Sequence, residues 1–283
     1  MLSVALAALS GLIWGVGDFS GGKATQRAAV LPVVWISKLV SLPLLVIYLI
    51  ATYVPVTAVG LAWGGLAGVA GVVGLVLFYR ALAAGAMTVV APVTGVTSAA
   101  IPVVVGLVAG ERPSFTRLLG VGCALLAIAL VSLAPHPARQ RQVVTRRLVI
   151  AALCAGTGFA LFFVLLAVAS KTAGGAVGLW PIAGSQISAL VILTLLVLMT
   201  RPGPWPRHAA LRWTMVAGPC DMTANALYLL ATRGGDLSVV APIAALYPVT
   251  TVILALIIEH ERLRGIQVAG LILAVAALVL VSR

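Results

Sequence analysis

The sequence contains little charge. Of its 283 residues only 8% are Asp, Glu, Lys or Arg, whereas 62% are hydrophobic. A soluble domain is about a quarter charged, because its surface must be hydrated. The shortage of charge excludes a soluble globule and a disordered chain, and it predicts a polytopic α-helical membrane protein.

Acidic residues are especially few. The chain has 6 Asp and Glu against 18 Lys and Arg, which gives a formal net charge of +12. In a soluble protein this excess would suggest nucleic-acid binding. Here the basic residues lie singly or in short clusters between apolar runs, and the one dense stretch, 139–147, contains no aromatic residue. Membrane topology and lipid headgroups explain the charge better, so we expect no nucleic-acid partner.

Catalytic and metal-binding motifs are missing from the sequence. The three cysteines, Cys123, Cys154 and Cys220, lie far apart in apolar segments, and the three histidines lie singly between such segments. No HExxH, GxSxG or P-loop pattern occurs. We therefore expect neither a metal nor a cofactor, and an enzyme is disfavoured.

Long apolar runs dominate the sequence. A helix that crosses a bilayer needs about 20 mostly apolar residues. Ten segments of the sequence qualify, and we expect an all-α protein with ten transmembrane helices. The segments are residues 3–21, 31–52, 60–82, 88–109, 116–134, 148–169, 177–199, 211–231, 238–258 and 265–282.

The chain also contains an internal repeat. When it is shifted by 150 residues, residues 81–132 lie over 231–282 without a gap. We expect a first five-helix repeat over 1–134, a basic linker over 135–147 and a second five-helix repeat over 148–283. Because five is odd, the two repeats have opposite orientations in the membrane. Inverted repeats of this kind are common among secondary transporters.

The repeated residues resemble a known family. The pattern Tyr79-Arg80-Ala81-Leu82, Gly85, Val90-Ala91-Pro92, Gly110-Glu111-Arg112 and Gly120 recurs as Tyr228-Leu229-Leu230-Ala231, Gly235, Val240-Ala241-Pro242, Glu261-Arg262 and Gly270. Together with Trp14-Gly15 in the first predicted helix, this resembles the EamA-type transporters of the drug/metabolite transporter superfamily. The resemblance covers essentially the whole chain and implies a ten-helix bundle with a central cavity. Known members export amino acids and other metabolites or carry sugar derivatives, so the resemblance does not specify a substrate.

The distribution of basic residues bears on orientation. Side A of the membrane, where residue 1 lies, has five basic residues in its loops, whereas side B has twelve. The positive-inside rule then places side B in the cytoplasm and both termini outside. The family resemblance implies the reverse, with both termini cytoplasmic. Alkaline phosphatase fused to the C-terminus distinguishes the two, since activity there would support the prediction from charge.

A few ionisable residues lie within the predicted spans, where a charge is costly and suggests a function. Four ionisable residues fall in the half of the membrane toward side B, and we predict that they form a polar layer lining a substrate cavity: Asp18, Lys38, Arg80 and Asp221. The carboxylates would bind a proton or a cationic group, and Lys38 or Arg80 an anionic one. For Arg80 we favour the alternative that its side chain extends to the lipid headgroups. The alternative is a static ion pair between Asp18 and Lys38. The candidate substrate- or ion-binding residues are Trp14, Asp18, Lys38, Asp221, Asn225, Tyr228 and Tyr247.

Prolines and small residues predict bends and close packing. The hinge candidates are Pro92, Pro102, Pro242 and Pro248, of which Pro92 and Pro242 occupy equivalent repeat positions. Small residues at spacing four, such as Gly60, Gly64 and Gly68, let neighbouring helices approach closely. We interpret Glu111-Arg112 and Glu261-Arg262 as pairs that fix the short turns after them.

Two functions remain open at this point. The first is a secondary transporter, an exporter of a small organic metabolite across a bacterial cytoplasmic membrane, which works by alternating access between the two five-helix halves. A carboxylate in apolar surroundings would suit coupling to protons. The alternative is a non-transporting membrane protein, such as a lipid handler, a sensor or an assembly subunit. The chain could act as a monomer or a homodimer.

Overall fold

The structure is a computed structural model that describes all residues except 84–86, 134–144, 173–176, 201 and 261–263. Most of the predicted linker 135–147, together with Gly85, Glu261 and Arg262, therefore lies outside the described residues. The described part contains helices and no β-strand. The helices are α1 (Leu2–Thr25), α2 (Val30–Val40), α3 (Leu42–Thr52), α4 (Ala58–Ala83), α5 (Met87–Val108), α6 (Phe115–Ser132), α7 (Arg146–Lys171), α8 (Trp180–Met199), α9 (Ala209–Gly234), α10 (Leu237–Ala244), α11 (Tyr247–Ile258) and α12 (Gly265–Val281).

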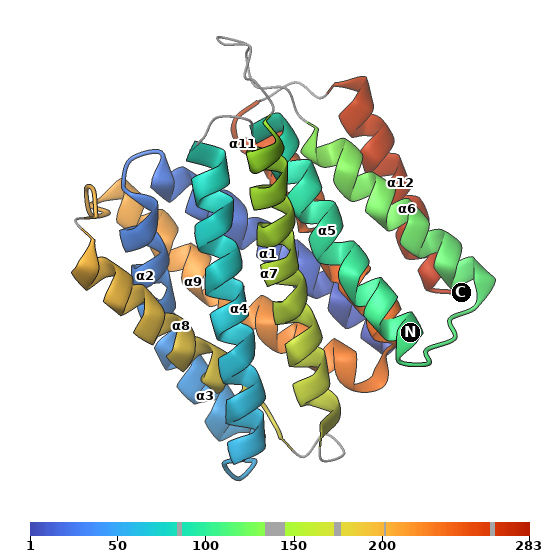
Figure 1. Ribbon diagram of the computed structural model, residues 1–283, viewed down its shortest axis with the longest axis horizontal. Helices are drawn as coiled ribbons and strands as arrows, with labels where there is room; N and C mark the ends of the chain where they lie inside the picture. Colours follow the sequence, from blue (N-terminus) through green and yellow to red (C-terminus); the bar gives the residue numbers. More distant parts are fainter. Residues whose placement is uncertain (84–86, 134–144, 173–176, 201, 261–263) are drawn as a thin grey trace.

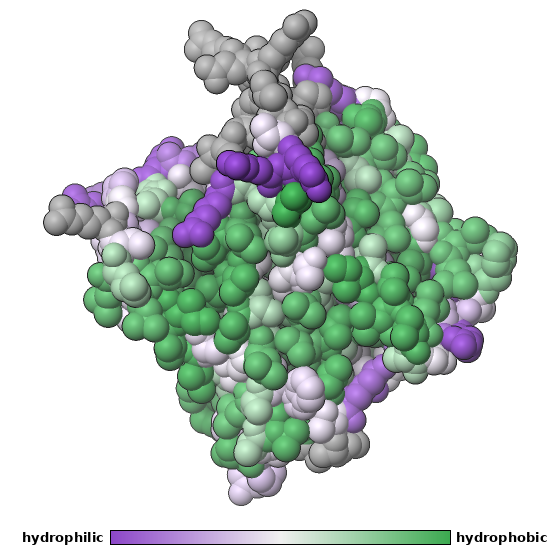
Figure 2. Space-filling model, in the orientation of Figure 1, coloured by the Kyte–Doolittle hydropathy of each residue, from purple (hydrophilic) through white to green (hydrophobic). Residues whose placement is uncertain are grey.

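Eight helical segments of the described chain are long and apolar enough to cross a membrane. In two of them a pair of helices forms one segment: α2 with α3 (Val30–Thr52), and α10 with α11 (Leu237–Ile258). The other six are α1, α4, α5, α6, α7 and α8. The face seen in Figure 2 is mostly apolar, with hydrophilic residues gathered near opposite ends. The prediction of an all-helical polytopic membrane protein is therefore confirmed.

Two of the spanning segments are broken. In the first, α2 gives way to α3 at Ser41, and Pro43 is the second residue of α3. In the second, α10 ends at Ala244 and α11 begins with Tyr247 and Pro248. Proline has no amide hydrogen to donate, so it favours the start of a helix over its interior. By contrast, α5 continues through both Pro92 and Pro102.

The helices pack in two groups that do not coincide with the two halves of the sequence. Group I consists of α4, α5, α7 and α8, and group II of α1, α2–α3, α9 and α10–α11. Each group therefore takes its helices from both halves. Figure 1 shows α6 and α12 side by side at one edge, and these two pack against each other. The chain ends also lie near each other in Figure 1, at the end of the bundle that we call side A.

Small residues allow the closest helix contacts, as the spacing of glycines predicts. A Cβ atom added to Gly64 of α4 would collide with the backbone of Pro181 in α8. One turn further along, a Cβ on Gly68 would collide with Ser185 and Ser188 of the same helix. The glycines therefore fix how closely α4 and α8 pack within group I.

Candidate functional site

The side chain of Asp18 is exposed although it points into the bundle. The exposed apolar residues Leu2, Leu9 and Leu12 form one stripe along α1. At 3.6 residues per turn, Asp18 lies on the opposite face, which it shares with the buried Trp14. Both sequence neighbours of Asp18 are buried, whereas Asp18 itself is exposed. The carboxylate therefore faces space inside the bundle and not the apolar outer surface.

Lys38 and Asp221 form an ion pair. Lys38 Nζ, on α2, lies 2.5 Å from Asp221 Oδ2, on α9. The alternative of a static ion pair between Asp18 and Lys38 is wrong, because α2 packs against α9 and α8 more extensively than against α1. In the part of the chain that the structure describes, no basic side chain lies within 4.0 Å of the Asp18 carboxylate. The charges of Asp18 and Asp221 still repel each other, which places the two carboxylates in the same region.

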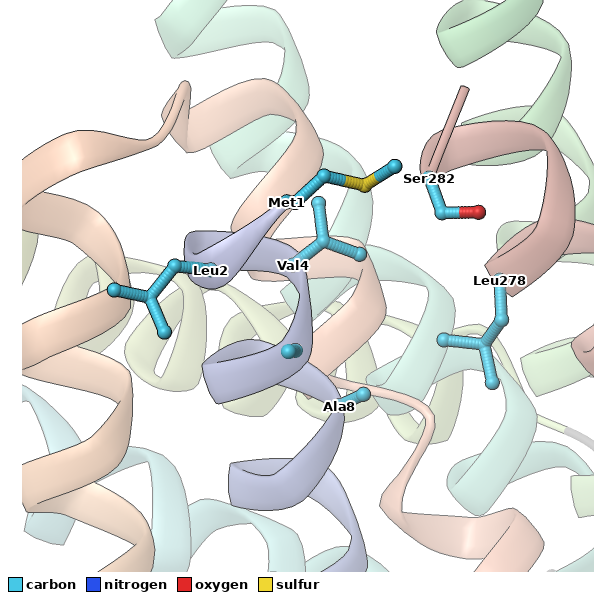
Figure 3. A pocket seen from close by; sticks show the side chains of 7 residues that line it. Met1, Leu2, Val4, Ala8, Leu278 and Ser282 are labelled. Carbon is cyan, nitrogen blue, oxygen red and sulfur yellow. The ribbon is translucent and has the colours of Figure 1, made fainter.

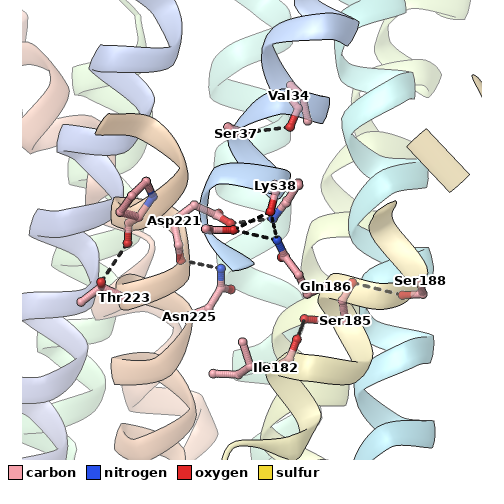
Figure 4. Close-up of polar contacts among 12 residues, drawn as sticks. Val34, Ser37, Lys38, Ile182, Ser185, Gln186, Ser188, Asp221, Thr223 and Asn225 are labelled. Atoms are coloured by element: carbon pink, nitrogen blue, oxygen red, sulfur yellow. Dashed lines mark hydrogen bonds and ion pairs between the residues drawn. The ribbon is translucent and has the colours of Figure 1, made fainter. Parts of the chain in front are cut away.

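Buried amide groups extend this polar layer (Figure 4). Gln186 Nε2, on α8, donates to Lys38 O at 2.6 Å and to Ser41 Oγ at 2.7 Å. Both acceptors lie where α2 gives way to α3, so Gln186 satisfies a carbonyl at a helix break. Asn225 Nδ2 donates to Asp221 O at 2.6 Å. Its Oδ1 atom is buried and has no partner among the described residues.

An aromatic cluster fills the interior between Asp18 and the side-A end of the bundle. The ring centroid of Trp14 lies 5.4 Å from that of Phe163 and 5.9 Å from that of Tyr228. Tyr228 is fully buried and donates its hydroxyl to Phe163 O at 3.0 Å. The predicted binding residues Trp14 and Tyr228 are thus packed against each other. Tyr247, the first residue of α11, and Tyr79 of α4 both lie close enough to Asp18 to interact with its charge.

Groups I and II meet at the centre of the bundle on side A. There α5 packs against α10 and α7 against α9, where the hydroxyls of Ser170 and Thr232 lie 2.9 Å apart. Toward side B, the corresponding pairs are α5 with α11 and α4 with α1, and neither forms a comparable contact among the described residues. At one edge the groups also touch toward side B, through α2 and α8, where Trp35 Nε1 donates to Thr194 Oγ1 at 2.9 Å. The space beside Asp18 is therefore closed toward side A.

Glu111 contributes to this closure on side A. Its carboxylate accepts hydrogen bonds from the backbone N–H groups of Leu237 at 2.7 Å and Ser238 at 2.8 Å, the first two residues of α10. It also lies 3.3 Å from Lys171 Nζ, on α7. The predicted turn pair of Glu111 with Arg112 is wrong, because Arg112 donates to the carbonyls of Leu107 and Glu111 instead. Glu111 joins the α5–α6 turn to one helix from each group.

A shallow recess lies apart from the polar layer, between the N-terminal end of α1 and the C-terminal end of α12 (Figure 3). It is lined by Leu2, Val4, Ala8 and Leu278, among others, and Ser282 lies at its edge. The lining contains no ionisable side chain. Its apolar character matches that of the outer surface of the bundle, so it is no part of the candidate site.

The fold and the polar interior define a polytopic membrane protein with ionisable groups held inside a helical bundle. The sequence model of the EamA-like transporter family matches residues 1–133 and 148–283, and the chain belongs to this family. It is therefore a membrane transporter of the drug/metabolite transporter superfamily, with a small-molecule substrate. No curated protein matches the chain.

The fold also resembles those of solved structures, of which 27 chains match. One of them, titled "Crystal structure of protein", has a TM-score of 0.78 and 14% sequence identity. The alignment covers 99% of this chain and 98% of the other. At this level of identity the likeness shows the fold alone.

Several residues of the polar layer were not predicted from the sequence. Ser41 and the break ahead of Pro43 place a backbone carbonyl within reach of Gln186. Tyr48 of α3 forms a hydrogen bond of 2.9 Å with Thr223 of α9, which adds a second polar link between these helices. The Ser-Leu-Pro sequence at 41–43 was the available signal, because a proline preceded by a hydroxyl residue favours a helix start.

Proposed function

We propose that this chain is a secondary transporter that exports a small organic metabolite across a bacterial cytoplasmic membrane by alternating access. The observation that carries this proposal is the difference between the two sides of the bundle. Groups I and II are packed together around Trp14 and Phe163 on side A, and they lack comparable contacts beside Asp18 toward side B. A binding site closed on one side and open on the other is one state of an alternating cycle. The direction, export, follows the known exporters of the family.

Ten membrane spans are part of this proposal. α9 and α12 join the eight segments that are long and apolar enough to cross. α9 has 26 residues and runs alongside α1, and its polar residues Asp221 and Asn225 bond within the bundle. α12 is shorter, with 17 residues, and packs along α6. Helices placed in this way beside spanning helices are themselves expected to span.

An inverted repeat is supported by matched glycine contacts in the two halves. Gly15 and Gly17 of α1 correspond to Gly156 and Gly158 of α7 by a common shift of 141 residues (156 − 15 and 158 − 17). Gly17 packs against α9, and Gly158 against α4. Gly15 and Gly156 each meet a threonine side chain and the carbonyl three residues before it, namely Thr250 with Tyr247 and Thr97 with Thr94. The repeats are assigned to 1–134 and 148–283, with the linker between them.

The moving units in the proposed cycle are groups I and II. The two halves of the sequence do not suit this role, because α1 of the first half is closely packed on α9 of the second. Likewise α4 of the first half is packed on α7 of the second. The two groups share fewer contacts with each other, which is what rocking around a central site requires.

The test uses a single reporter cysteine at Asp18 in a chain whose native Cys123, Cys154 and Cys220 have been replaced. The cysteine is uncharged, and it therefore mimics the protonated carboxyl of Asp18, which is also uncharged while the site moves between the two sides. A membrane-impermeant maleimide is applied from each face of oriented vesicles. We expect labelling of Asp18→Cys from both faces, because the site alternates. Labelling from side B alone would contradict alternating access.

Two disulfide locks distinguish which parts move. Ser170→Cys with Thr232→Cys joins α7 of group I to α9 of group II, where the native hydroxyls are 2.9 Å apart. Gly17→Cys with the native Cys220 restored joins α1 to α9 within group II, at a Cβ–Cβ separation of 3.2 Å. We expect the first lock to abolish labelling from side A until the disulfide is reduced, and the second to leave it unchanged. If the sequence halves moved instead, the second lock would block labelling and the first would not.

Coupling to protons is a further part of the proposal. Asp18 lies close enough to Asp221, Tyr79 and Tyr247 for their charges to interact, and Lys38 is already bonded to Asp221. A carboxylate without a basic partner can take up and release a proton as the site opens to either side. Vesicle transport with and without an imposed pH gradient tests this. Full retention of gradient-driven transport by Asp18→Asn would remove the coupling role.

A further inference from the structure

We propose that the space beside Asp18 is a binding site for an organic cation, whose ammonium group is held by the Asp18 carboxylate. This inference rests on the proposed transport function and narrows its substrate class. Four observations carry it: the free carboxylate, the lysine already engaged, a buried acceptor without a partner, and the aromatic rings nearby.

One carboxylate of the polar layer, that of Asp18, has no ion-pair partner among the described residues. Lys38 and Asp221 are bonded to each other at 2.5 Å and cancel, and both belong to group II. The nearby Arg80, near the side-B end of α4, is exposed and forms no ion pair among the described residues. Asp18 therefore places a carboxylate without an ion-pair partner among the described residues on the inner face of α1. A site of this sign attracts cations and repels anions.

The position of Asp18 makes this charge accessible. Gly15, one turn before it, lets α11 approach on one flank, and Gly17 lets α9 approach on the other. Asp18 itself lies between these flanks and is exposed toward the interior. A ligand can therefore reach the carboxylate without displacing a packed side chain.

The third observation is the amide of Asn225. The residue is only 5% exposed, and its Oδ1 atom accepts no hydrogen bond among the described residues. Leaving a buried acceptor without a donor is costly, which points to a partner supplied by a ligand. Figure 4 shows Asn225 one turn from Asp221, pointing from α9 into the space toward α8. An acceptor at this point suits an N–H or O–H donor supplied by a bound molecule.

Aromatic residues complete the description of the site. Tyr79 of group I and Tyr247 of group II lie near Asp18, and Trp14 lies one turn away on the same face of α1. Aromatic faces attract ammonium groups, and the attraction is strongest where water is excluded. An apolar or aromatic substituent on the cation would rest against the cluster of Trp14 and Phe163.

A zwitterion is less well matched by the same site. Its carboxylate would need a cationic partner, and the nearest candidate, Lys38, is already bonded to Asp221. Recruiting Lys38 would leave Asp221 as a second uncompensated carboxylate in the layer. The predicted role of Lys38 in binding an anionic group is therefore replaced by a role in neutralising Asp221.

The test measures thermal stabilisation of the purified chain by ligands of matched shape and different charge. The probes are primary ammonium ions from methylammonium to phenylethylammonium, each compared with the alcohol and the carboxylate of the same skeleton. We expect one or more ammonium ions to stabilise the protein, with little or no effect of their alcohols and carboxylates. Asp18→Asn should weaken this binding about tenfold or more, because it removes the charge that pairs with the ammonium.

Two matched variants serve as controls. Asp18→Glu keeps the charge and should retain binding within a few-fold, which shows that any loss in Asp18→Asn is not a folding defect. Asp236→Asn makes the same chemical change at the side-A end of the bundle and should bind like the wild type. The inference is overturned if no ammonium ion gives a shift that Asp18→Asn reduces, or if a carboxylate gives the larger shift. Because binding is measured without transport, this outcome is distinct from a failure of the maleimide test.

Discussion

Lys38 and Asp221 are 183 positions apart in the chain, yet Lys38 Nζ lies 2.5 Å from Asp221 Oδ2 in the middle of the bundle. The pair joins α2 of the first half to α9 of the second. It holds group II together at the depth of the proposed site, and it neutralises the positive charge of Lys38. This relationship supports the first prediction.

Replacing both partners of the pair should destabilise the protein by less than the sum of the two single replacements. Lys38→Met leaves Asp221 as a partly buried carboxylate without its cation, and Asp221→Asn leaves Lys38 without its anion. We expect each to cost about 1–3 kcal/mol, and the double variant to cost less than the sum. Thermal unfolding in detergent measures the four proteins of this cycle. Strictly additive losses would show that the ion pair contributes nothing to stability.

Gln186 should be important for stability because of what it bonds. It is 3% exposed, and its amide satisfies Lys38 O at the α2–α3 break. Gln186→Met keeps the length of the side chain and removes the donor, so we expect a loss of about 1–3 kcal/mol. Ser188→Ala, on the same helix, is the control, because Ser188 bonds only to the carbonyl of Ser185. Equal stability of the two variants would contradict the role assigned to Gln186.

The contrast between Gly64 and Gly65 isolates the close packing of α4 on α8. A Cβ on Gly64 would meet the backbone of Pro181, which cannot move aside as a flexible side chain would, whereas a Cβ on Gly65 meets nothing within 4 Å. Gly64→Ala should therefore destabilise by about 1–3 kcal/mol. Gly65→Ala should be neutral or stabilising by up to about 1 kcal/mol, since alanine favours a helix. Unfolding temperatures that rank the two variants in the opposite order would refute this packing.

Much of the fold follows from composition and periodicity. Uniform apolar runs of the right length define spanning helices, because the bilayer leaves the backbone no other way to satisfy its hydrogen bonds. Among the long helices, α9 is not identified as a spanning segment by its composition. Its polar and charged residues, Arg212, Asp221, Asn225 and Arg233, lower its apolar character, and only its packing shows where it lies. The break at Ser41 is equally hidden in an apolar run.

The candidate site was predicted less completely. The depth of a residue in the membrane follows from its position along its helix. Depth alone therefore predicted that Asp18, Lys38 and Asp221 lie in the same layer. Which of them pair depends on how each helix is rotated and which helix lies beside it, and neither follows from depth. The sequence repeat suggested that the two halves of the chain are the moving units. Close glycine contacts, such as that of Gly17 with α9, instead join helices of one half to helices of the other.

Glu111 provides a test of the closure on side A in the neutral pH range. Its carboxylate bonds to the first two residues of α10 and to Lys171. Glu111→Gln keeps the shape but weakens the acceptor, so the contact between the groups on side A should open more often. We expect faster maleimide labelling of Asp18→Cys from side A, with little change from side B. Asp236→Asn, near the same helix end, should leave both rates unchanged. Unaltered side-A labelling in Glu111→Gln would show that this contact does not hold the bundle closed.

The same carboxylate should make stability depend on pH in acid. Partial burial raises the pKa of Glu111, but hydrogen bonds from Ser238, Leu237 and Lys171 outweigh it and leave the pKa below its ordinary value. A carboxyl whose pKa is lower in the folded state stabilises the fold at higher pH, and this contribution is lost as the pH falls through the folded-state pKa. The loss should therefore begin near pH 4.3, roughly the ordinary pKa of a glutamate, and continue below it. Unfolding temperatures of wild type and Glu111→Gln, measured between about pH 7 and pH 3, should converge over this acidic range. A constant difference between the two proteins across it would contradict the assignment.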